Sequence, residues 1–340
     1  MIKSKVNIAI VGATGAVGKV FIDLIHERNF PANEIRLLAS QRSAGKLIKV
    51  NGNDLTVSTT TNDSFENIDI AFISASADVS REFAPVAVKN GAIVIDDSSA
   101  FRLNKNVPLV IPEINADDLL LHEGITAIPN CSTIQMAMVL KPLHDKNPIK
   151  RVIVDTYQAV SGTGIEAINE LSEQTKNYVN SKDISSHVYP HQIAFNLLPH
   201  IEPFLESGYT NEEQKMINET RKILHEPKML ISATCVRVPV FYAHSEAIHI
   251  EFENPFDPED AKAILGNFPG IVVYDDPQNN QYPMPITAVN KNEVFVGRIR
   301  KDISCKNGLA LWVVSDNLRK GAALNAMQIA EHMIKMDLIK

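Results

Sequence analysis

One cysteine lies where a protein would place a nucleophile. A short apolar run ends at Pro129, Asn130 and Cys131 follow, and the next stretch, STIQMAMVLKPL, is patterned like a helix. The N-terminus of a helix stabilises negative charge, so it should lower the pKa of a thiol there towards the reactive thiolate. Cysteine is also among the most often buried residues, where it acts as a small apolar side chain. The position of Cys131 alone leaves both interpretations open.

The other two cysteines have ordinary surroundings. Cys235 lies inside the apolar strand pattern ISATCVRV, and Cys305 lies in the polar turn DISCKNG. We expect the first to be buried and the second to be a surface thiol. An odd number of cysteines without CxxC spacing predicts neither a disulfide framework nor a cysteine-rich metal site, and no metal is expected.

A reactive thiol needs a base, and His244 is the candidate among the ten histidines. It opens the strand pattern HSEAIHIEFEN, in which Ile248 and Ile250 alternate with polar residues. Because a strand repeats every two residues, His244 should share the inward face with these apolar residues, while His249 points outward. A histidine at the inward-facing end of a strand could serve as a general base. A hydrogen-bonded core histidine is the alternative.

Two arginines could hold an anionic substrate. Arg237 precedes His244 in RVPVFYAHS, and Arg102 follows a predicted parallel strand in DDSSAFR, at the strand end where open α/β sheets bind ligands. Bidentate contacts from arginine suit carboxylates and phosphates. Structural ion pairs are the alternative for both.

A glycine-rich turn, VGATGAVG, follows the first predicted strand and precedes a predicted helix. Gly12, Gly15 and Gly18 would let the backbone approach a pyrophosphate at the helix N-terminus, although plain strand-to-helix packing also uses such turns. The second strand ends in LLASQRSAGK, which has no carboxylate for a ribose 2′-hydroxyl. Ser40, Arg42 and Ser43 suit a 2′-phosphate instead, so NADP is favoured over NAD unless Arg42 is only a solvated loop residue.

The elements that must position these residues change character along the chain. Up to about residue 130, short β-rich runs alternate with amphipathic stretches, which predicts a parallel sheet with helices on both faces. From about residue 150, consecutive strand patterns predict a mostly antiparallel sheet, interrupted by a long irregular stretch over 181–210. The last segment, 319–338, is a predicted helix that could return to the first domain. We therefore expect an α/β protein with a Rossmann-like domain of residues 1–130 and 318–340, and an α+β domain of residues 131–317.

Composition excludes several classes of function. The chain has 340 residues, 45% of them hydrophobic and 21% charged, and a formal net charge of −7 without a Lys/Arg block. This argues against nucleic acid as a partner. No apolar run approaches the length of a membrane span, and the apolar part of the N-terminal stretch is too short for a signal peptide. We expect a cytoplasmic protein with reduced thiols and no membrane partner.

Together these features make the chain resemble the aspartate-β-semialdehyde dehydrogenases nearly from end to end. The motifs that carry the resemblance are VGATGAVG, SSAFR, IPNCST, TYQAVSGTG, EEQKMINET, RVPVFYAHSEA and SDNLRKGAALNA. The cysteine motif and the segment from RVPV to the histidine are specific together, whereas the glycine motif is not. Ala243 is a departure, because many relatives have glycine before the histidine.

The resemblance implies a reaction. Cys131 would attack the acyl phosphate of L-aspartyl-4-phosphate, phosphate would leave a thioester, and hydride from NADPH would convert it to L-aspartate-4-semialdehyde. This chemistry belongs to the biosynthesis of lysine through diaminopimelate, and of threonine, methionine and isoleucine. Members of the family are homodimers or homotetramers built through the second domain.

The resemblance also implies roles for individual residues. His244 would be the acid/base and Gln158 would orient the reacting group, beside the nucleophile Cys131. Substrate would be bound by Arg237 at the α-carboxylate, Glu212 at the amine, and Arg102, Asn130 and Lys215 at the phosphate. The cofactor would be bound by Gly12, Thr14, Gly15, Ala16, Val17, Ser40, Arg42, Ser43, Ser161, Gly162 and Asn317.

Rival functions remain at this point. N-acetyl-γ-glutamyl-phosphate reductase shares the chemistry, but its substrate has an acetylated amine, against which Glu212 would be misplaced. A phosphorylating aldehyde dehydrogenase of the glyceraldehyde-phosphate type is more distant. A non-catalytic NADP-binding protein on the same scaffold is the alternative from another class.

Overall fold

The computed structural model describes residues 5–339, which form two compact units. The first unit consists of two segments, one that ends at Asn130 and one that begins at Ala322. The second unit comprises Cys131–Gly321. The chain passes back to the first unit four residues later than the expected boundary between 317 and 318. The change of unit falls in a π-helical turn, Arg319–Ala323. Each unit is described by itself.

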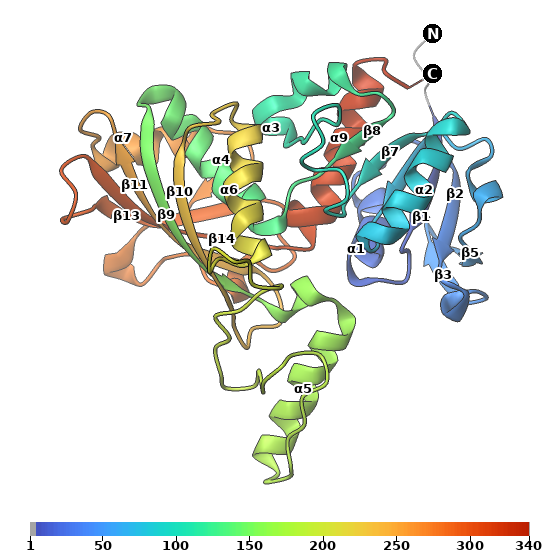
Figure 1. Ribbon diagram of the computed structural model, residues 1–340, viewed down its shortest axis with the longest axis horizontal. Coiled ribbons are helices and arrows are strands. Elements are labelled where there is room, and N and C mark those ends of the chain that lie inside the picture. The colour runs from blue at the N-terminus through green and yellow to red at the C-terminus, as the bar shows by residue number, and fades with distance from the viewer. Residues whose placement is uncertain (1–4, 340) are drawn as a thin grey trace. The chain divides into compact units, whose positions relative to one another are not determined.

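The first unit is built on a six-stranded parallel sheet in the order β5-β2-β1-β6-β7-β8 (Figure 1). Its strands β1, β6 and β7 are almost wholly buried, as expected where helices cover both faces. The strands are β1 (Val6–Val11), β2 (Ala32–Ala39), β5 (Ser58–Thr59), β6 (Ile70–Ile73), β7 (Ile93–Asp96) and β8 (Ile125–Ala127), with a separate hairpin of β3 (Leu47–Val50) and β4 (Asn53–Thr56).

Helices cover the two faces of this sheet. One core cluster joins the β1 side chains Ile8 and Ile10 to α1 (Ala16–Glu27) and α9 (Leu324–Lys335), and a second joins the other face of β1 to α2 (Ala77–Lys89). A short helix, α3 (Pro112–Asn115), follows β7. The expectation that the C-terminal helix returns to the first unit is therefore confirmed, with Met327 and Ala330 buried in its core.

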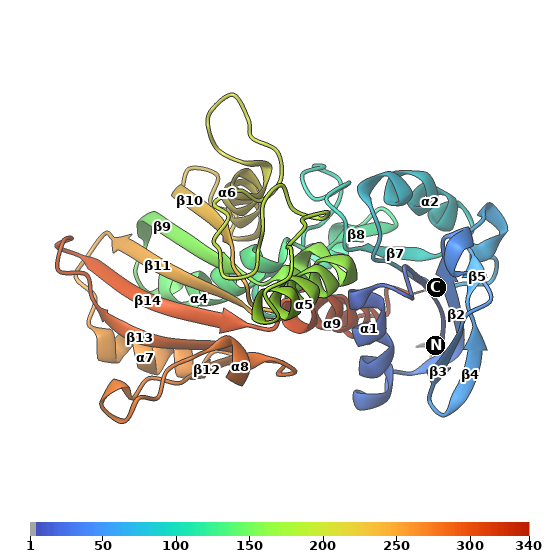
Figure 2. The same ribbon diagram turned by 90° about the horizontal axis from the view of Figure 1, so that it is seen from below.

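The second unit is built on a six-stranded mixed sheet in the order β10-β9-β11-β14-β13-β12 (Figure 2). The inner pairs are antiparallel, whereas each edge pair, β10 with β9 and β12 with β13, is parallel. The edge strands are reached by long connections, which parallel pairing requires. The strands are β9 (Ile149–Gln158), β10 (Leu230–Arg237), β11 (His244–Phe252), β12 (Ile271–Val273), β13 (Val294–Lys301) and β14 (Gly308–Ser315).

Helix α4 (Cys131–Lys146) packs against the central strands of this sheet and is buried over most of its length. The other helices are α5 (Ile165–Val179), α6 (Asn211–Ile223), α7 (Pro258–Gly266) and α8 (Pro285–Ala288). Figure 1 shows α5 and the loop after it projecting from the sheet as an arm. Short 3-10 segments are η1 (Gln41–Ser43), η2 (Asn62–Phe65), η3 (Ala116–Leu121), η4 (Val160–Thr163) and η5 (Pro277–Asn279).

The predicted fold class is confirmed, with differences in detail. The stretch 55–60 contributes to two strands, β4 and β5, with the buried Val57 between them. The stretch 181–210 has no regular helix or strand, as expected. Across residues 5–339 no helix has both the length and the hydropathy that crossing a membrane requires.

Candidate active site

The glycine turn of the first unit needs its glycines for its own geometry. Gly12 has φ +88°, and a Cβ there would lie 2.0 Å from the carbonyl oxygen of Ser74. A Cβ at Gly18 would lie 2.3 Å from the carbonyl oxygen of Gly12. Gly15, at the start of α1, has no side chain with which to cap the helix, and no acidic residue lies in the first turn. The helix therefore presents its first N–H groups to an anion.

The loop after β2 lies against this turn. Thr14 Oγ1 donates a hydrogen bond to Ser43 Oγ at 3.3 Å, so the end of β2 and the glycine turn are linked. Ser40 and Arg42 are exposed on the same loop, and Ala16 and Val17 begin α1. Open helix N–H groups, hydroxyls and an arginine in one place fit the phosphates of NADP.

Arg102 of the first unit is buried and held by the strand end before it. Its Nη2 donates to the carbonyl oxygen of Asp97 at 2.7 Å. Burial raises the pKa of the Asp97 carboxyl to about 6, against the opposing effect of Arg102 and of a hydrogen bond from Ser74. Asn130, the last residue of this segment of the first unit, is also buried. Arg102 is thus held within its own unit by a main-chain hydrogen bond, and its role towards substrate stays a prediction.

In the second unit, Cys131 is the first residue of α4 and is partly exposed. A Cβ at Gly321 would lie 3.0 Å from the Cys131 Cβ and 3.6 Å from the Asn317 Cβ, so both residues face this glycine. Cys235 differs, because it is fully buried with its Sγ 3.6 Å from Met216 Sδ, and burial raises its pKa far above the usual range. Of the three cysteines, only Cys131 combines partial exposure with a helix start.

His244 is 1% exposed and lies on the covered face of β11. The backbone N–H of Ala159 donates to its Nδ1 at 3.0 Å. Its Nε2 has no hydrogen-bond partner among the described residues. Burial, and next the Arg237 guanidinium, hold the pKa of His244 well below its usual value. The imidazole is therefore neutral at physiological pH. His249 points to the other face, as expected from the strand period, and is half-exposed.

Arg237 converges with His244 on the loop that follows β9. Its Nη1 donates to the carbonyl oxygen of Ala159 at 2.8 Å. A Cβ at Gly162 would lie 3.1 Å from both Arg237 Nη1 and His244 Nε2. Gly162 is itself exposed. The guanidinium and the imidazole therefore lie close to a residue that solvent reaches.

Gln158 and Glu212 form a buried polar pair on the same side. Gln158 Nε2 donates to Glu212 Oε1 at 3.0 Å, and Thr156 Oγ1 donates to Gln158 Oε1 at 3.0 Å. Lys215 Nζ lies 3.4 Å from Glu212 Oε2 and is also paired with Glu202. Glu212 thus already has a cationic partner, which shows that a cation can be held at this carboxylate.

The amide oxygen of Asn317 has hydrogen-bond partners, whereas its amide nitrogen has none among the described residues. Its Oδ1 accepts from the Ala243 N–H at 3.0 Å and from Ser161 Oγ at 3.1 Å. Its Nδ2 is buried and has no partner in the described part of the chain. An orphaned amide donor suits a carbonyl oxygen, such as that of a nicotinamide carboxamide. Ala243 adopts φ +69°, a conformation that costs an alanine about 1–2 kcal/mol.

Two buried residues close to these in the chain were not predicted from the sequence. Ala159 holds both His244 and Arg237 through its backbone, and only its place after Gln158 could have indicated it. Glu246, two residues after His244, is fully buried, and burial raises its pKa to about 8 against a weaker opposing effect of Gln135. The alternation of polar and apolar residues along β11 places Glu246 on the inward face, which is a signal that the sequence does contain.

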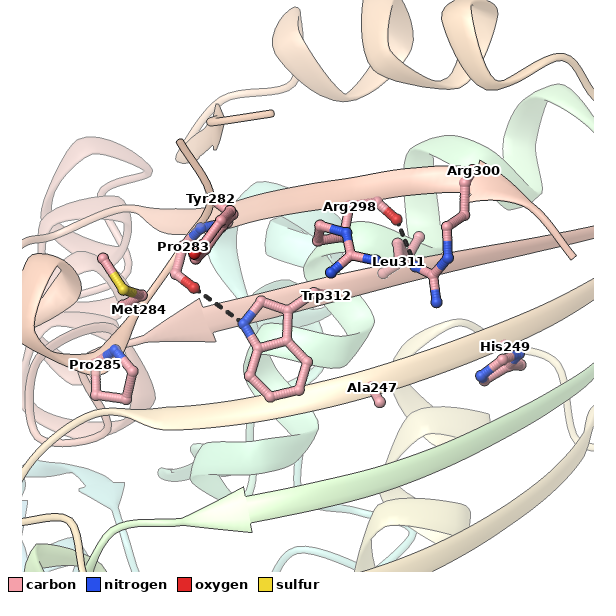
Figure 3. A pocket seen from close by; sticks show the side chains of 10 residues that line it. All are labelled: Ala247, His249, Tyr282, Pro283, Met284, Pro285, Arg298, Arg300, Leu311 and Trp312. Atoms are coloured by element: carbon pink, nitrogen blue, oxygen red, sulfur yellow. Dashed lines mark hydrogen bonds between the residues drawn. The ribbon is translucent and has the colours of Figure 1, made fainter. Parts of the chain in front are cut away.

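A separate pocket of about 340 Å³ lies on the other face of the second sheet. Figure 3 shows Trp312 at its centre, with its Nε1 donating to the Pro283 carbonyl at 3.0 Å, and Arg298 and Arg300 along one side. None of the predicted site residues lines it. This face of the sheet is therefore distinct from the candidate active site.

Comparisons with known proteins agree along the whole chain. Residues 7–122 match the family model described as semialdehyde dehydrogenase, NAD binding domain, and residues 140–320 match semialdehyde dehydrogenase, dimerisation domain. The aspartate-semialdehyde dehydrogenases of Aquifex aeolicus and Bacillus subtilis are 54% and 50% identical to it, each over 98% of this chain and 99% of theirs.

Solved structures give the same result. Aspartate semialdehyde dehydrogenase II from Vibrio cholerae, in the crystal structure complexed with ASA, has a TM-score of 0.95 at 43% identity over 98% of this chain and 99% of that one. The Candida albicans enzyme with NADP has a TM-score of 0.77 at 28% identity over 99% of this chain and 100% of that one. The chain belongs to the aspartate-semialdehyde dehydrogenase family.

Proposed function

We propose that this chain is an NADP-dependent aspartate-semialdehyde dehydrogenase, which converts L-aspartyl-4-phosphate to L-aspartate-4-semialdehyde and phosphate. The observation that carries this proposal is the convergence of His244 Nε2 and Arg237 Nη1 beneath Gly162, in the unit where α4 begins at Cys131. Full-length relatives with this activity in their names support the same reaction. It serves the biosynthesis of lysine through diaminopimelate, and of threonine, methionine and isoleucine.

Cys131 is the nucleophile in this proposal. Its sulfur attacks the acyl carbon, phosphate leaves, and the substrate is held as a thioester, which splits one difficult step into two easier ones. The start of α4 favours the thiolate, because the helix N-terminus stabilises negative charge. NADPH, when bound, supplies the hydride that reduces the acyl carbon.

The remaining polar residues position the substrate. Arg237 binds the α-carboxylate, for which its fixed guanidinium is suited, and Glu212 binds the ammonium group in place of Lys215. Lys215 then shares the phosphate with Arg102 and Asn130, and Gln158 orients the reacting group. These roles rest on the family resemblance together with the contacts above.

The first unit is the proposed NADP-binding domain and the second the proposed catalytic and dimerisation domain. The open N-terminus of α1 would hold the pyrophosphate, and Ser40, Arg42 and Ser43 would hold the 2′-phosphate. In the second unit, Asn317 Nδ2 would donate to the carboxamide beside Ser161 and Gly162.

The protein oligomerises, and a homodimer or homotetramer formed through the second unit is the proposed state. The arm carries exposed apolar side chains, among them Tyr178 at 57% and Phe195 at 61% exposure. Tyr157 and Trp312 add an aromatic pair on the open face of the sheet, with ring centroids 5.4 Å apart. Large exposed apolar areas of this kind are typical of interfaces. We place the protein in the cytoplasm, where its three free cysteines would stay reduced.

One assay tests the reaction. The purified protein is given NADP, phosphate and aspartate semialdehyde, and in parallel N-acetylglutamate semialdehyde, and the reduction of NADP is followed spectrophotometrically. Turnover of aspartate semialdehyde is expected. Turnover of the acetylated aldehyde alone would show the protein to be an N-acetyl-γ-glutamyl-phosphate reductase, and turnover of neither would favour a non-catalytic protein.

A further inference from the structure

Two rows of buried side chains cross the covered face of the second sheet, since residues opposite each other on paired strands point to the same face. The first row, at the strand ends, consists of Arg237, Gln158, His244 and Ser315. The second row, two residues further along the strands, consists of Cys235, Thr156, Glu246 and Val313. The carboxyl of Glu246 therefore lies directly behind the row that contains His244.

Gln135 of α4 reaches both rows. Its Oε1 accepts a hydrogen bond from Ser315 Oγ, in the first row, at 2.8 Å. Its amide also acts on the carboxyl of Glu246, in the second row. Gln135 Nε2 and both Glu246 carboxyl oxygens are buried, and no hydrogen bond of good geometry reaches them from residues 5–339. Because buried polar atoms are paired in folded proteins, the amide and the carboxyl are the partners available to each other.

Gln135 also lies one helical turn after Cys131, which begins α4. Residues four apart in an α-helix lie on the same side of it, so Gln135 belongs to the turn that carries the cysteine. The hydrogen bond from Ser315 ties this turn to β14, and the contact with Glu246 ties it to β11. The place of Cys131 relative to the sheet thus depends on what Gln135 binds.

We propose that Gln135, held between Ser315 and Glu246, is a clamp that fixes the first turn of α4 and so positions Cys131 for its reaction. Ser315, Gln135 and Glu246 are positioning residues, which act through the helix. The proposal rests on the proposed function for the role of Cys131.

The clamp requires Glu246 to be a neutral carboxylic acid. The Gln135 amide offers an N–H donor and, besides the lone pair that accepts from Ser315, a second lone pair on Oε1. A carboxylic acid satisfies both, because its carbonyl oxygen accepts and its hydroxyl donates. A carboxylate can only accept, and its charge would repel the Gln135 oxygen. Ionisation of Glu246 should therefore weaken the clamp.

The surroundings of Glu246 favour the neutral form. On the covered face of the strands, the charged or titratable neighbours are Cys235, Arg237 and His244. On the helices they are Cys131 of α4 and Glu212 and Glu213 of α6, whereas the other charged or titratable residues of α4 begin at Lys141. Arg237 donates to the Ala159 carbonyl oxygen, and Lys141 is paired with Asp145. Burial therefore dominates, and it raises the pKa of Glu246 to about 8.

Infrared spectroscopy tests the protonation of Glu246 without turnover. A protonated carboxylic acid and a carboxylate absorb at different frequencies, so the difference between the spectra of the native chain and Glu246→Gln isolates this residue. We expect the band of the acid at about pH 7 and its loss by about pH 9, one unit to either side of the pKa. A carboxylate band already present at pH 7 would overturn the proposal.

Two variants test the positioning role. Gln135→Met keeps the length of the side chain and removes both hydrogen bonds. It should lower kcat by about 10–100-fold with little change in KM, because a misplacement of about 1 Å costs up to about 10² in rate. Ser315→Ala removes one bond, should lower kcat by a smaller factor, and serves as the milder change if Gln135→Met does not fold. A native kcat in either folded variant would refute the clamp.

Amide hydrogen exchange measures the clamp itself and needs no substrate. Exchange in the peptide 131–138, followed by mass spectrometry, should be faster in Gln135→Met or Ser315→Ala than in the native chain at the same pH. Equal exchange would mean that Gln135 does not hold the first turn of α4. Failure of the proposed function would instead appear as absent turnover in the native chain, with the infrared and exchange results intact.

The pH profile of kcat gives a readout that a merely structural role would not change. The amide of Glu246→Gln can make both hydrogen bonds and does not titrate. The kcat of the native chain relative to this variant should therefore fall by about tenfold at pH 9, where about one carboxyl in ten stays protonated. Glu251→Gln, a partly exposed position on the same strand, is the control and should follow the native profile. Identical profiles for the native chain and Glu246→Gln would contradict the proposal.

Discussion

At the scale of single residues, exposure and partners distinguish chemistry from packing. The three cysteines have the same side chain, yet only Cys131 is both partly exposed and placed at a helix start. The surroundings of Cys235 raise its pKa by burial and by the nearby Glu212, so it stays an unreactive thiol. Reactivity here follows from position in the fold.

The two cysteines should therefore respond differently to substitution. Cys131→Ala should remove essentially all turnover, because no other group can carry the acyl intermediate. Cys235→Ala should keep the activity and lower the free energy of unfolding by about 1–2 kcal/mol, because it leaves a small cavity beside Met216. Initial rates and thermal unfolding measure both effects. Substantial activity in Cys131→Ala would contradict the thioester mechanism.

At the scale of elements, the sequence predicted the strands and helices themselves. It did not predict the contacts between loops and side chains at the ends of these elements. The period of β11 placed His244 inward and His249 outward, and the structure agrees. The sequence could not show that the Ala159 peptide brackets His244 and Arg237. That contact depends on how the loop after β9 meets β10 and β11, which no local pattern encodes.

The glycine turn allows a test in which two glycines of one motif differ. Gly12→Ala should destabilise the first unit and abolish NADP binding, because its Cβ would meet the Ser74 carbonyl oxygen at 2.0 Å. Gly15→Ala should destabilise the fold much less, because its φ is −73° and its Cβ would lie 3.2 Å from the Gly12 carbonyl oxygen, a tight contact that a small shift relieves. Calorimetric titration with NADP and thermal unfolding report the two effects. Unchanged stability in Gly12→Ala would contradict the steric argument.

The buried Glu246 on β11 makes stability depend on pH. Its pKa is about 8 in the folded chain and 4.5 in an exposed glutamate, so between these values the folded state binds more protons than the unfolded state. The contribution of this residue to stability therefore falls as pH rises through this window. Glu246→Gln cannot ionise, and its melting temperature relative to the native chain should rise from pH 5 to pH 8.

Glu251→Gln, a partly exposed position on the same strand, is the control for this experiment. Its melting temperature should follow that of the native chain at every pH. If Glu246→Gln and Glu251→Gln behave alike, the carboxyl of Glu246 is not the source of the pH dependence.

At the scale of the whole molecule, the described chain forms two compact units, each with its own six-stranded sheet. The fold class, the returning C-terminal helix and the motif order were predictable, because hydrophobic periodicity and glycine turns are local signals. The surface through which copies associate could not be predicted from pattern. The proposed surface, with Tyr178 and Phe195, lies on an arm whose sequence predicts only a helix followed by an irregular loop. Their rings lie 4.5 Å apart and are largely exposed, so a partner that covers them would gain much of its burial there.

The arm is therefore where we expect the oligomer to be most sensitive. Replacing Tyr178 and Phe195 together by serine should shift the protein towards the 37.6 kDa monomer, because it removes two exposed aromatic side chains of the arm and leaves Cys131 and His244 unchanged. Leu121→Ser, at an exposed apolar position of the first unit, is the matched control and should leave the mass unchanged. Light scattering after size-exclusion chromatography measures both. If the double variant keeps the native mass, the arm is not the interface. The open face of the second sheet, where Tyr157 and Trp312 lie together, would then be the next candidate.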